Sequence, residues 1–207
     1  MSNQPTSYNK RRKDRGFASF HRAVMEKIAQ CPSSSVAFTT ENGRGVRKSF
    51  AKDITKVMTV LVNEMCFHSR KIGKATSHGF SLRTWGFIAE QCDLPLWRIK
   101  QCAKFAFAKG WITSKQPRES FTGSDNIEKW RGLASIKRIE LKYFADLGVK
   151  FEEEYEAARL AAKEWLKAKA RRFGRPIKYI QTPITLLRRR RKEAAERKAP
   201  KSAPIPV

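Results

Sequence analysis

Lysine and arginine are the side chains of this sequence with the most evident chemistry, because they bind phosphate. The 207 residues include 44 Lys plus Arg and 19 Asp plus Glu, which gives a formal net charge of +25. A charge of this size repels itself unless a polyanion lies nearby, and nucleic acid is the polyanion that fits best. A membrane partner is not expected, because membrane-surface helices combine basic residues with a continuous apolar face that the ends of this chain lack.

The densest run of charge lies near the C-terminus. Its members are consecutive: Arg188, Arg189, Arg190, Arg191 and Lys192. Such a run can be an ordinary solvated surface, but the overall charge favours contacts with DNA phosphates. These contacts would be independent of base sequence and strongest at low salt.

A second group of side chains lies between Pro95 and Gly110. Apolar positions recur there at helical spacing: Ile99, Cys102, Ala103 and Ala106. The opposite helix face then carries polar and aromatic tips: Trp97, Lys100, Gln101 and Lys104. Gln can pair with adenine and Lys can reach guanine, so this face is suited to contact base edges, although ordinary solvation of a surface helix is the alternative. Arg98 lies to one side, and Arg83 and Thr84 open the preceding helix, where phosphate contacts are expected.

A third basic group surrounds a segment rich in Gly, Ser and Asn between residues 115 and 131. Its cations are Lys115, Arg118, Lys129 and Arg131. Phe121 and Trp130 are interleaved with them. A basic loop of this kind contacts phosphates or enters a minor groove, whereas a flexible surface loop, with Asp125 and Glu128 lowering its charge, is the alternative.

Catalytic and metal-binding patterns are missing from the sequence. The three histidines stand singly: His21, His68 and His78. Nicking initiators and relaxases need closely spaced histidine ligands near a tyrosine nucleophile. The stretch GKAT at 73–76 lacks the earlier glycine of a phosphate loop. We therefore predict a non-enzymatic protein with no catalytic residue, no metal and no cofactor.

The spacing of apolar residues predicts the elements that carry these groups. Helices are expected from Phe17 to before Pro32, and over 49–68, 82–91 with Ser81 as N-cap, 95–109 and 151–174; strands are expected at 36–39, 111–113 and 136–143. The order of helix, short helix, tight turn, helix, strand, basic loop and strand is typical of a winged helix-turn-helix. The predicted fold is mainly α, of the α+β class, with a winged helix-turn-helix core.

The predicted organisation has four parts. Residues 1–16 form a disordered, basic N-terminal arm, and residues 17–150 form the winged-helix DNA-binding domain. Residues 151–174 form a C-terminal helix that packs on or extends from the core, and residues 175–207 form a basic disordered tail. The polar start of the chain and the lack of a run of ~20 apolar residues predict a cytoplasmic protein.

Several short motifs resemble the IncFII-type plasmid replication initiator family. They are MCFH at 65–68, SL at 81–82, IAEQC at 88–92, FAKGWI at 107–112, RIEL at 138–141 and LGV at 147–149. The likeness extends over about residues 17–172, whereas the basic C-terminal extension is shorter than in many relatives. The resemblance implies a protein that binds double-stranded DNA at its own plasmid's origin and recruits host replication proteins. It also implies a recognition helix over 95–109, whose exposed residues contact DNA.

Two other functions stay open at this point. A winged-helix transcriptional regulator would use the same fold on an operator, but the sequence shows no recognisable sensor or dimerisation segment. A basic RNA-binding protein fits less well, because a groove-binding helix has little use on A-form RNA. The origin sequence, the oligomeric state and the ability to melt DNA are not predicted.

Overall fold

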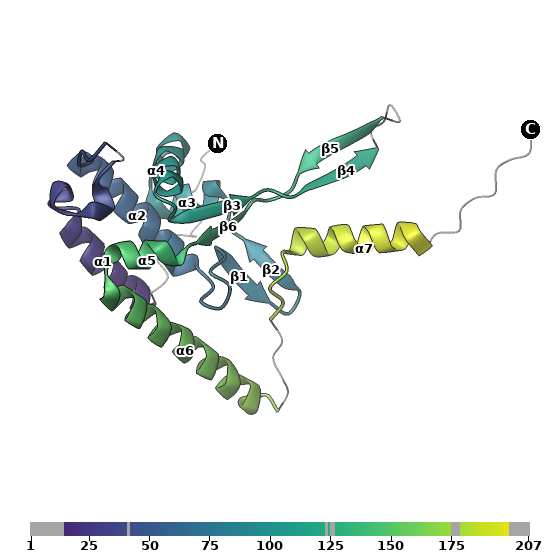
Figure 1. Cartoon of the computed structure of the whole chain (residues 1–207). Helices are drawn as coiled ribbons and strands as arrows, with labels where there is room; N and C mark the ends of the chain where they lie inside the picture. The colour runs from purple at the N-terminus through teal and green to yellow at the C-terminus, as the bar shows by residue number, and fades with distance from the viewer. Residues whose placement is uncertain (1–14, 41, 123, 125–126, 175–178, 199–207) are drawn as a thin grey trace, which may run out of the picture.

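The computed structural model describes residues 15–40, 42–122, 124, 127–174 and 179–198. Over these residues it contains seven α-helices and three short antiparallel strand pairs (Figure 1). The predicted α+β class, with helix predominating, is therefore confirmed. No helix in the described part of the chain is both long enough and apolar enough to cross a lipid bilayer.

Helix α2 (Lys48–Glu64) is the centre of the helical body because one of its faces is apolar. Its buried apolar residues follow helical spacing: Ala51, Ile54, Val57, Met58, Leu61 and Val62. α1 (Gly16–Ile28) packs against it and adds buried residues to the same core. Both predicted helices are confirmed, except that α2 ends four residues before His68. Met65 pairs instead with Ile72, and Arg70 takes a left-handed conformation with φ 56° in the turn between them.

Two short 3-10 helices, η1 (Pro32–Ser34) and η2 (Val36–Phe38), join α1 to α2. The predicted strand over 36–39 is wrong. The Ser35 hydroxyl accepts a hydrogen bond from the Ala37 amide at 3.3 Å, and this contact starts a turn where the sequence pattern predicts an extended chain.

A hairpin that the sequence did not predict follows α2: β1 (Gly73–Thr76) pairs with β2 (Gly79–Leu82). Ser81 and Leu82, expected to cap and start a helix, lie in β2. α3 (Trp85–Cys92) begins later, because the Thr84 hydroxyl accepts the Phe87 amide at 3.1 Å and is the actual N-cap.

Helix α4 (Leu96–Ala108) follows α3 after a tight turn, as predicted. Asp93 has φ 53°, the left-handed conformation that ends α3, and Pro95 is the extended residue before α4. Gly110 has φ 70° just beyond α4, which lets the chain reverse into a strand.

A small sheet then packs beside α4. β3 (Ile112–Lys115) pairs with β6 (Ile136–Ile139). Residues 70–72 lie along the other edge of β6: the Ile72 amide donates to the Lys137 carbonyl at 3.0 Å, and the Ile139 amide donates to the Arg70 carbonyl at 3.1 Å. The chain between α2 and α3 thus extends the β3–β6 pair by one short antiparallel segment.

The loop expected between the two strands is itself a hairpin. β4 (Arg118–Thr122) pairs with β5 (Glu128–Gly132), and it continues the direction of β3 and β6 away from the helices (Figure 1). Six residues lead from Ile112 to Arg118, and seven lead from Gly132 to Ile139, so one extra residue interrupts the ladder between the two pairs.

Two helices follow the sheet. The strand predicted to reach Tyr143 ends at Ile139, because Tyr143 and Phe144 are buried on one side of a short helix, α5 (Leu141–Leu147). The predicted helix after Gly148 is confirmed as α6 (Val149–Arg172). Its first turns pack on the core, where Tyr155 stacks on Phe144 with ring centroids 4.9 Å apart.

The expectation of a disordered tail from residue 175 is wrong for residues 179–198. The Ile180 amide donates to the Thr76 carbonyl at 2.9 Å, and the Phe80 amide donates to the Thr182 carbonyl at 2.8 Å, so this segment docks on the β1–β2 hairpin. It leads into α7 (Ile184–Lys198). Gly79 has φ 136°, and a Cβ there would meet the side chain of Ile184 at 2.8 Å, so glycine permits this contact. Residues 175–178 and 199–207, and 1–14 of the predicted N-terminal arm, lie outside the described residues, and Gly16 already belongs to α1.

Candidate nucleic-acid interface

The outer face of α4 has the composition that the sequence predicts. Its inner face is buried at the four expected positions: Ile99, Cys102, Ala103 and Ala106. Lys100, Gln101 and Lys104 are exposed on the other side, and Trp97 is 61% exposed in the first turn. The helix therefore presents two cations, an amide and an indole to the surroundings.

Arg98 does not lie toward solvent as expected but joins α4 to α2. Its Nε donates to Asp53 Oδ2 at 2.7 Å, and its guanidinium lies 4.7 Å from the centre of the Phe50 ring. Its Nη1 also donates to Gln101 Oε1 at 3.0 Å. Arg98 is therefore a positioning residue, and its bond to Gln101 leaves a second lone pair on Oε1 and both protons of the amide nitrogen for an adenine.

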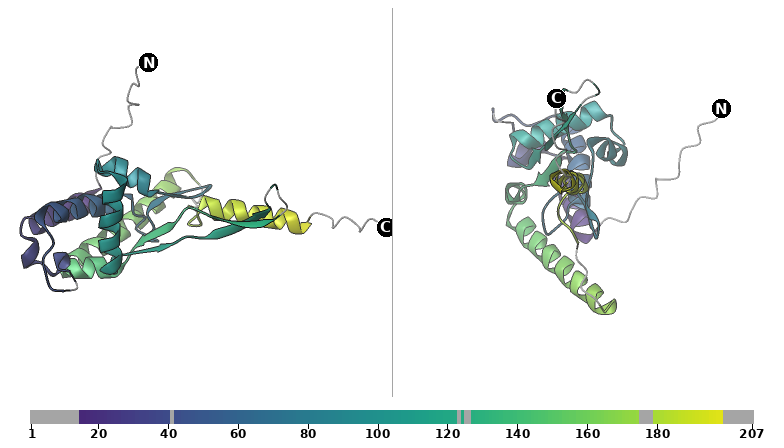
Figure 2. Two further views of the ribbon diagram at one scale, coloured as in Figure 1. Left: turned by 90° about the horizontal axis from the view of Figure 1, so that it is seen from above. Right: turned by 90° about the vertical axis from the view of Figure 1, so that its right-hand side faces the viewer.

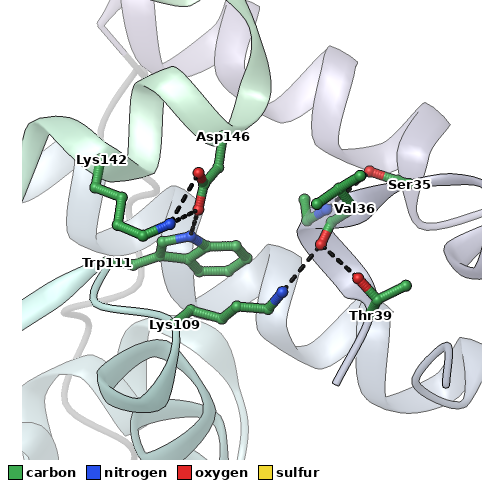
Figure 3. A network of polar contacts seen from close by, with 8 residues as sticks. Ser35, Val36, Thr39, Lys109, Trp111, Lys142 and Asp146 are labelled. Carbon is green, nitrogen blue, oxygen red and sulfur yellow. Dashed lines mark hydrogen bonds and ion pairs between the residues drawn. The ribbon is translucent and has the colours of Figure 1, made fainter. Parts of the chain in front are cut away.

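The other end of α4 is fixed by a polar network (Figure 3). The Lys109 ammonium donates to the Val36 carbonyl at 3.0 Å, which ties the C-cap of α4 to η2. The Trp111 indole donates to Asp146 Oδ2 at 2.8 Å, and Lys142 donates to the same oxygen at 2.8 Å. With Arg98 near one end and this network at the other, α4 is held in one orientation against the body.

Arg83 and Thr84 also make contacts within the molecule, although Arg83 is only half-buried and Thr84 is exposed. Arg83 Nε donates to Glu64 Oε2 at 2.6 Å, and its guanidinium lies 4.3 Å from the centre of the Phe87 ring. Its carbonyl accepts a hydrogen bond from Lys137 at 2.7 Å, and the Thr84 hydroxyl is used as the N-cap. These two residues join α2, α3 and β6, and they are less available to phosphate than the sequence suggested.

Lys137 is a buried cation that sequence analysis missed. Burial lowers the pKa of its ammonium from 10.5 to about 8. The ammonium lies 4.9 Å from the centre of the Trp85 ring, and this contact offsets part of the desolvation. The alternation of β6 could have indicated it, because Lys137 lies two residues before the buried Ile139 and therefore on the same face of the strand, whereas Arg138 between them is exposed.

The β4–β5 hairpin holds three of the predicted contacts. Arg131 forms an ion pair with Glu119 across the two strands and lies 5.6 Å from the centre of the Phe121 ring. Lys129 is exposed on the same strand. Arg118 is exposed at the start of β4, and its carbonyl accepts a hydrogen bond from Arg189 at 3.0 Å.

This last bond places α7 beside the hairpin, and both project from the same side of the helical body (Figures 1 and 2). We call β4, β5 and α7 together the basic arm. On α7, Arg189 also pairs with Glu193 at 3.1 Å. The remaining cations of the predicted run are exposed: Arg188, Arg190, Arg191 and Lys192. The structure therefore brings the cations of the hairpin and those of the C-terminal run together. The outer face of α4 is a separate surface.

Two further cations lie on the exposed side of α2 and were not predicted. Lys52 and Lys56 are one helical turn apart, and both are exposed. Burial raises the pKa of the Cys92 thiol to about 12, and Lys56 acts against this shift, so Lys56 lies near the turn between α3 and α4. The helical spacing of the two lysines was visible in the sequence, but their nearness to α4 depends on the tertiary fold.

Three buried polar side chains of the core contact one another. His21 Nε2 and the Tyr143 hydroxyl are 2.5 Å apart, and Thr59 lies 3.4 Å from His21 Nδ1. Burial, with Arg22 nearby, lowers the pKa of His21 to about 3. Among the described residues, no three His, Cys, Asp or Glu side chains are grouped so that they could hold a metal ion.

Comparisons of the chain with known protein families, with curated proteins and with solved structures found no match.

Proposed function

We propose that this chain is a sequence-specific DNA-binding protein of the winged helix-turn-helix class, with α4 as its recognition helix. One observation carries the proposal. Lys100, Gln101 and Lys104 are exposed together on a helix whose opposite face is buried and which is fixed near both ends. Base discrimination needs hydrogen-bonding groups held in a fixed orientation, and this helix supplies them.

The order and pairing of the elements support the winged-helix assignment. α2 is followed by a short extended segment and the β1–β2 hairpin, then by two helices joined by a tight turn, and then by β3 and β6. The extended segment at 70–72 pairs with β6, so the first and last extended segments of the unit are neighbours. The β4–β5 hairpin then takes the place of the wing.

The position of the basic arm is consistent with α4 contacting bases while the arm contacts phosphates. The strand from Ile112 to Thr122 includes β3 and β4. At about 3.3 Å for each residue it reaches roughly 35 Å, which is close to one turn of B-DNA. Because β3 lies beside α4, the far end of β4 can contact phosphates about one turn away from the bases that α4 contacts.

The resemblance in sequence motifs carries the proposal one step further. We propose that the DNA is a plasmid origin, and that the chain acts in the bacterial cytoplasm as a replication initiator that engages host replication proteins. This function needs no catalytic step and no cofactor in the chain itself.

Selection of binding sites from random duplex DNA, followed by affinity measurements, tests the DNA-binding proposal. Changing Lys100, Gln101 and Lys104 to Ala should cost about 1–3 kcal/mol for each lost base contact on the selected site and little on random DNA. The matched control changes Lys163 and Lys167 on α6 to Ala, which removes the same two charges. If the α4 variant keeps full discrimination, or the control loses as much, α4 is not the recognition helix.

A transplantation experiment tests the initiator proposal separately. The gene and its flanking DNA are placed on a circle that cannot replicate alone, and maintenance of the circle in cells is scored. Maintenance that is lost in the α4 variant supports initiation. Specific binding without maintenance would contradict initiation and favour the transcriptional regulator.

A further inference from the structure

Trp130 is a large apolar side chain with no packing role that explains its position. It lies in the middle of β5 and is 66% exposed, whereas Trp111 in the core is fully buried. Its partner across the hairpin is Ser120, which is too small to cover an indole. The positions two residues along either strand share this face, and they are occupied by Arg118, Thr122, Glu128 and Gly132. None of these described neighbours is apolar and large.

The opposite face of the hairpin is built differently. Phe121 and Lys129 face one another across the strands, as do Glu119 and Arg131. Arg131 lies over the Phe121 ring and pairs with Glu119, so the aromatic ring on that face already has a cation as its neighbour. The two aromatic residues of the hairpin therefore differ, since only Trp130 presents an open ring surface.

The charge around Trp130 indicates the kind of ligand. Arg118 and Glu128 share its face and offset one another. The positive charge comes from α7, which lies beside β4 through the contact of Arg189 with the Arg118 carbonyl and exposes Arg188, Arg190, Arg191 and Lys192. An open aromatic ring in a cationic surrounding is suited to a strand whose bases can stack and whose phosphates are negative. Duplex DNA offers the phosphates, but its bases are already stacked on one another.

We propose that the face of the β4–β5 hairpin with Arg118 and Trp130 binds single-stranded DNA, with an unpaired base stacked on the Trp130 indole. The strand's phosphates lie along the cations of α7. This inference rests on the proposed DNA-binding function and deepens it, because it gives the chain a second site with a different DNA ligand. The first site, on α4, contacts duplex DNA.

The test measures binding of the full chain to a labelled oligo-dT of about 16 nucleotides and to the selected duplex. Trp130→Ala should weaken oligo-dT binding about tenfold, the loss expected for one stacked base, and should change duplex affinity by less than about twofold. Trp130→Phe should retain most of the binding, because a phenyl ring still stacks. Quenching of tryptophan fluorescence by oligo-dT should also fall in both variants.

Trp165→Ala is the matched control, because Trp165 is 57% exposed and belongs to α6, a helix that lies apart from β4, β5 and α7 (Figure 1). It should bind oligo-dT like the parent chain. The proposal is overturned if Trp130→Ala binds oligo-dT normally, if it loses duplex and oligo-dT affinity equally, or if Trp165→Ala loses as much. Failure of α4 to discriminate duplex sequences is measured on other variants, so it is distinguishable from these outcomes.

Discussion

The outer face of α4 and the basic arm are both cationic, but they are supported in opposite ways. α4 rests on the core and is held near its ends by Arg98 with Asp53 and by Lys109 with η2. The arm projects from the body, and two of its arginines are paired with carboxylates of the arm itself, Glu119 and Glu193. A helix held in one orientation is suited to discriminate between bases. A projecting arm, whose arginines can exchange a carboxylate for a phosphate, is suited to bind any DNA backbone.

The largest expected difference between the two regions is in stability. Ile99→Ala removes a fully buried side chain under α4 and should lower the free energy of unfolding by about 2–5 kcal/mol. Phe121→Ala in the arm should cost less than about 1 kcal/mol, because its ring is only half-buried on a two-stranded hairpin. Urea denaturation followed by circular dichroism measures both. Equal losses would show that the arm is part of the cooperative unit.

The next expected effect is a loss of stability of the helical body in acid, caused by His21. Burial lowers the pKa of His21 to about 3, so below its ordinary value of 6.5 the unfolded chain binds a proton that the folded chain does not. The contribution of His21 to the free energy of unfolding is therefore fully present above pH 6.5. It should fall by about 1.4 kcal/mol for each pH unit as the pH drops from 6.5 toward 3.

Urea denaturation at pH 7 and at lower pH checks this expectation. His21→Gln cannot titrate and should show a smaller loss in acid than the parent chain. His78→Gln, at an exposed position, is the control and should behave like the parent. The same acid loss in all three proteins would contradict a role for His21.

The helices of the body could be predicted from the sequence, whereas the strands and helix of the arm could not. The apolar spacing of α2 and α4 was enough to predict both helices and the buried face of α4, because burial against a core imposes a period of 3.6 residues. The β1–β2 and β4–β5 hairpins were missed. Their strands are only four or five residues long, and polar residues fill most of their positions, so no alternating pattern marks them.

The sequence could not predict which arginines form ion pairs within the protein and which remain exposed. Arg98 and Arg83 look like the other surface cations until the fold brings Asp53 and Glu64 beside them. α7 was also missed, because its order depends on the distant β1–β2 hairpin and on Gly79 rather than on its own composition. Long-range contacts of this kind leave no local periodicity.

The salt dependence of DNA binding should divide the regions in a third way. Truncation after Leu187 removes the exposed cations of α7 but keeps Ile184 and Leu187, which pack near Gly79. Affinity for selected and random duplexes should fall alike, and the slope of log K against log salt should flatten by about 0.9 for each phosphate contact removed. The ratio between the two DNAs should not change. If truncation abolishes the ratio, α7 carries part of the specificity.

The smallest expected effect concerns the carboxylate that neutralises the arm. Glu119 is paired with Arg131, whose side chain is 62% exposed. Glu119→Gln removes one negative charge and leaves Arg131 available to a phosphate. All duplexes should then bind more tightly by the same factor, up to about fivefold, because exposed ion pairs are worth at most about 1 kcal/mol.

Glu164→Gln on α6 makes the same change of charge outside the arm and should leave DNA affinity nearly unchanged. A gain in Glu119→Gln that is confined to the selected sequence would mean that Arg131 contacts a base, and the arm would then share the role of α4. An equal gain in both variants would mean that net charge alone sets the affinity. A gain in Glu119→Gln alone, equal on all sequences and weaker at high salt, is the result expected if the hairpin binds phosphate while α4 binds bases.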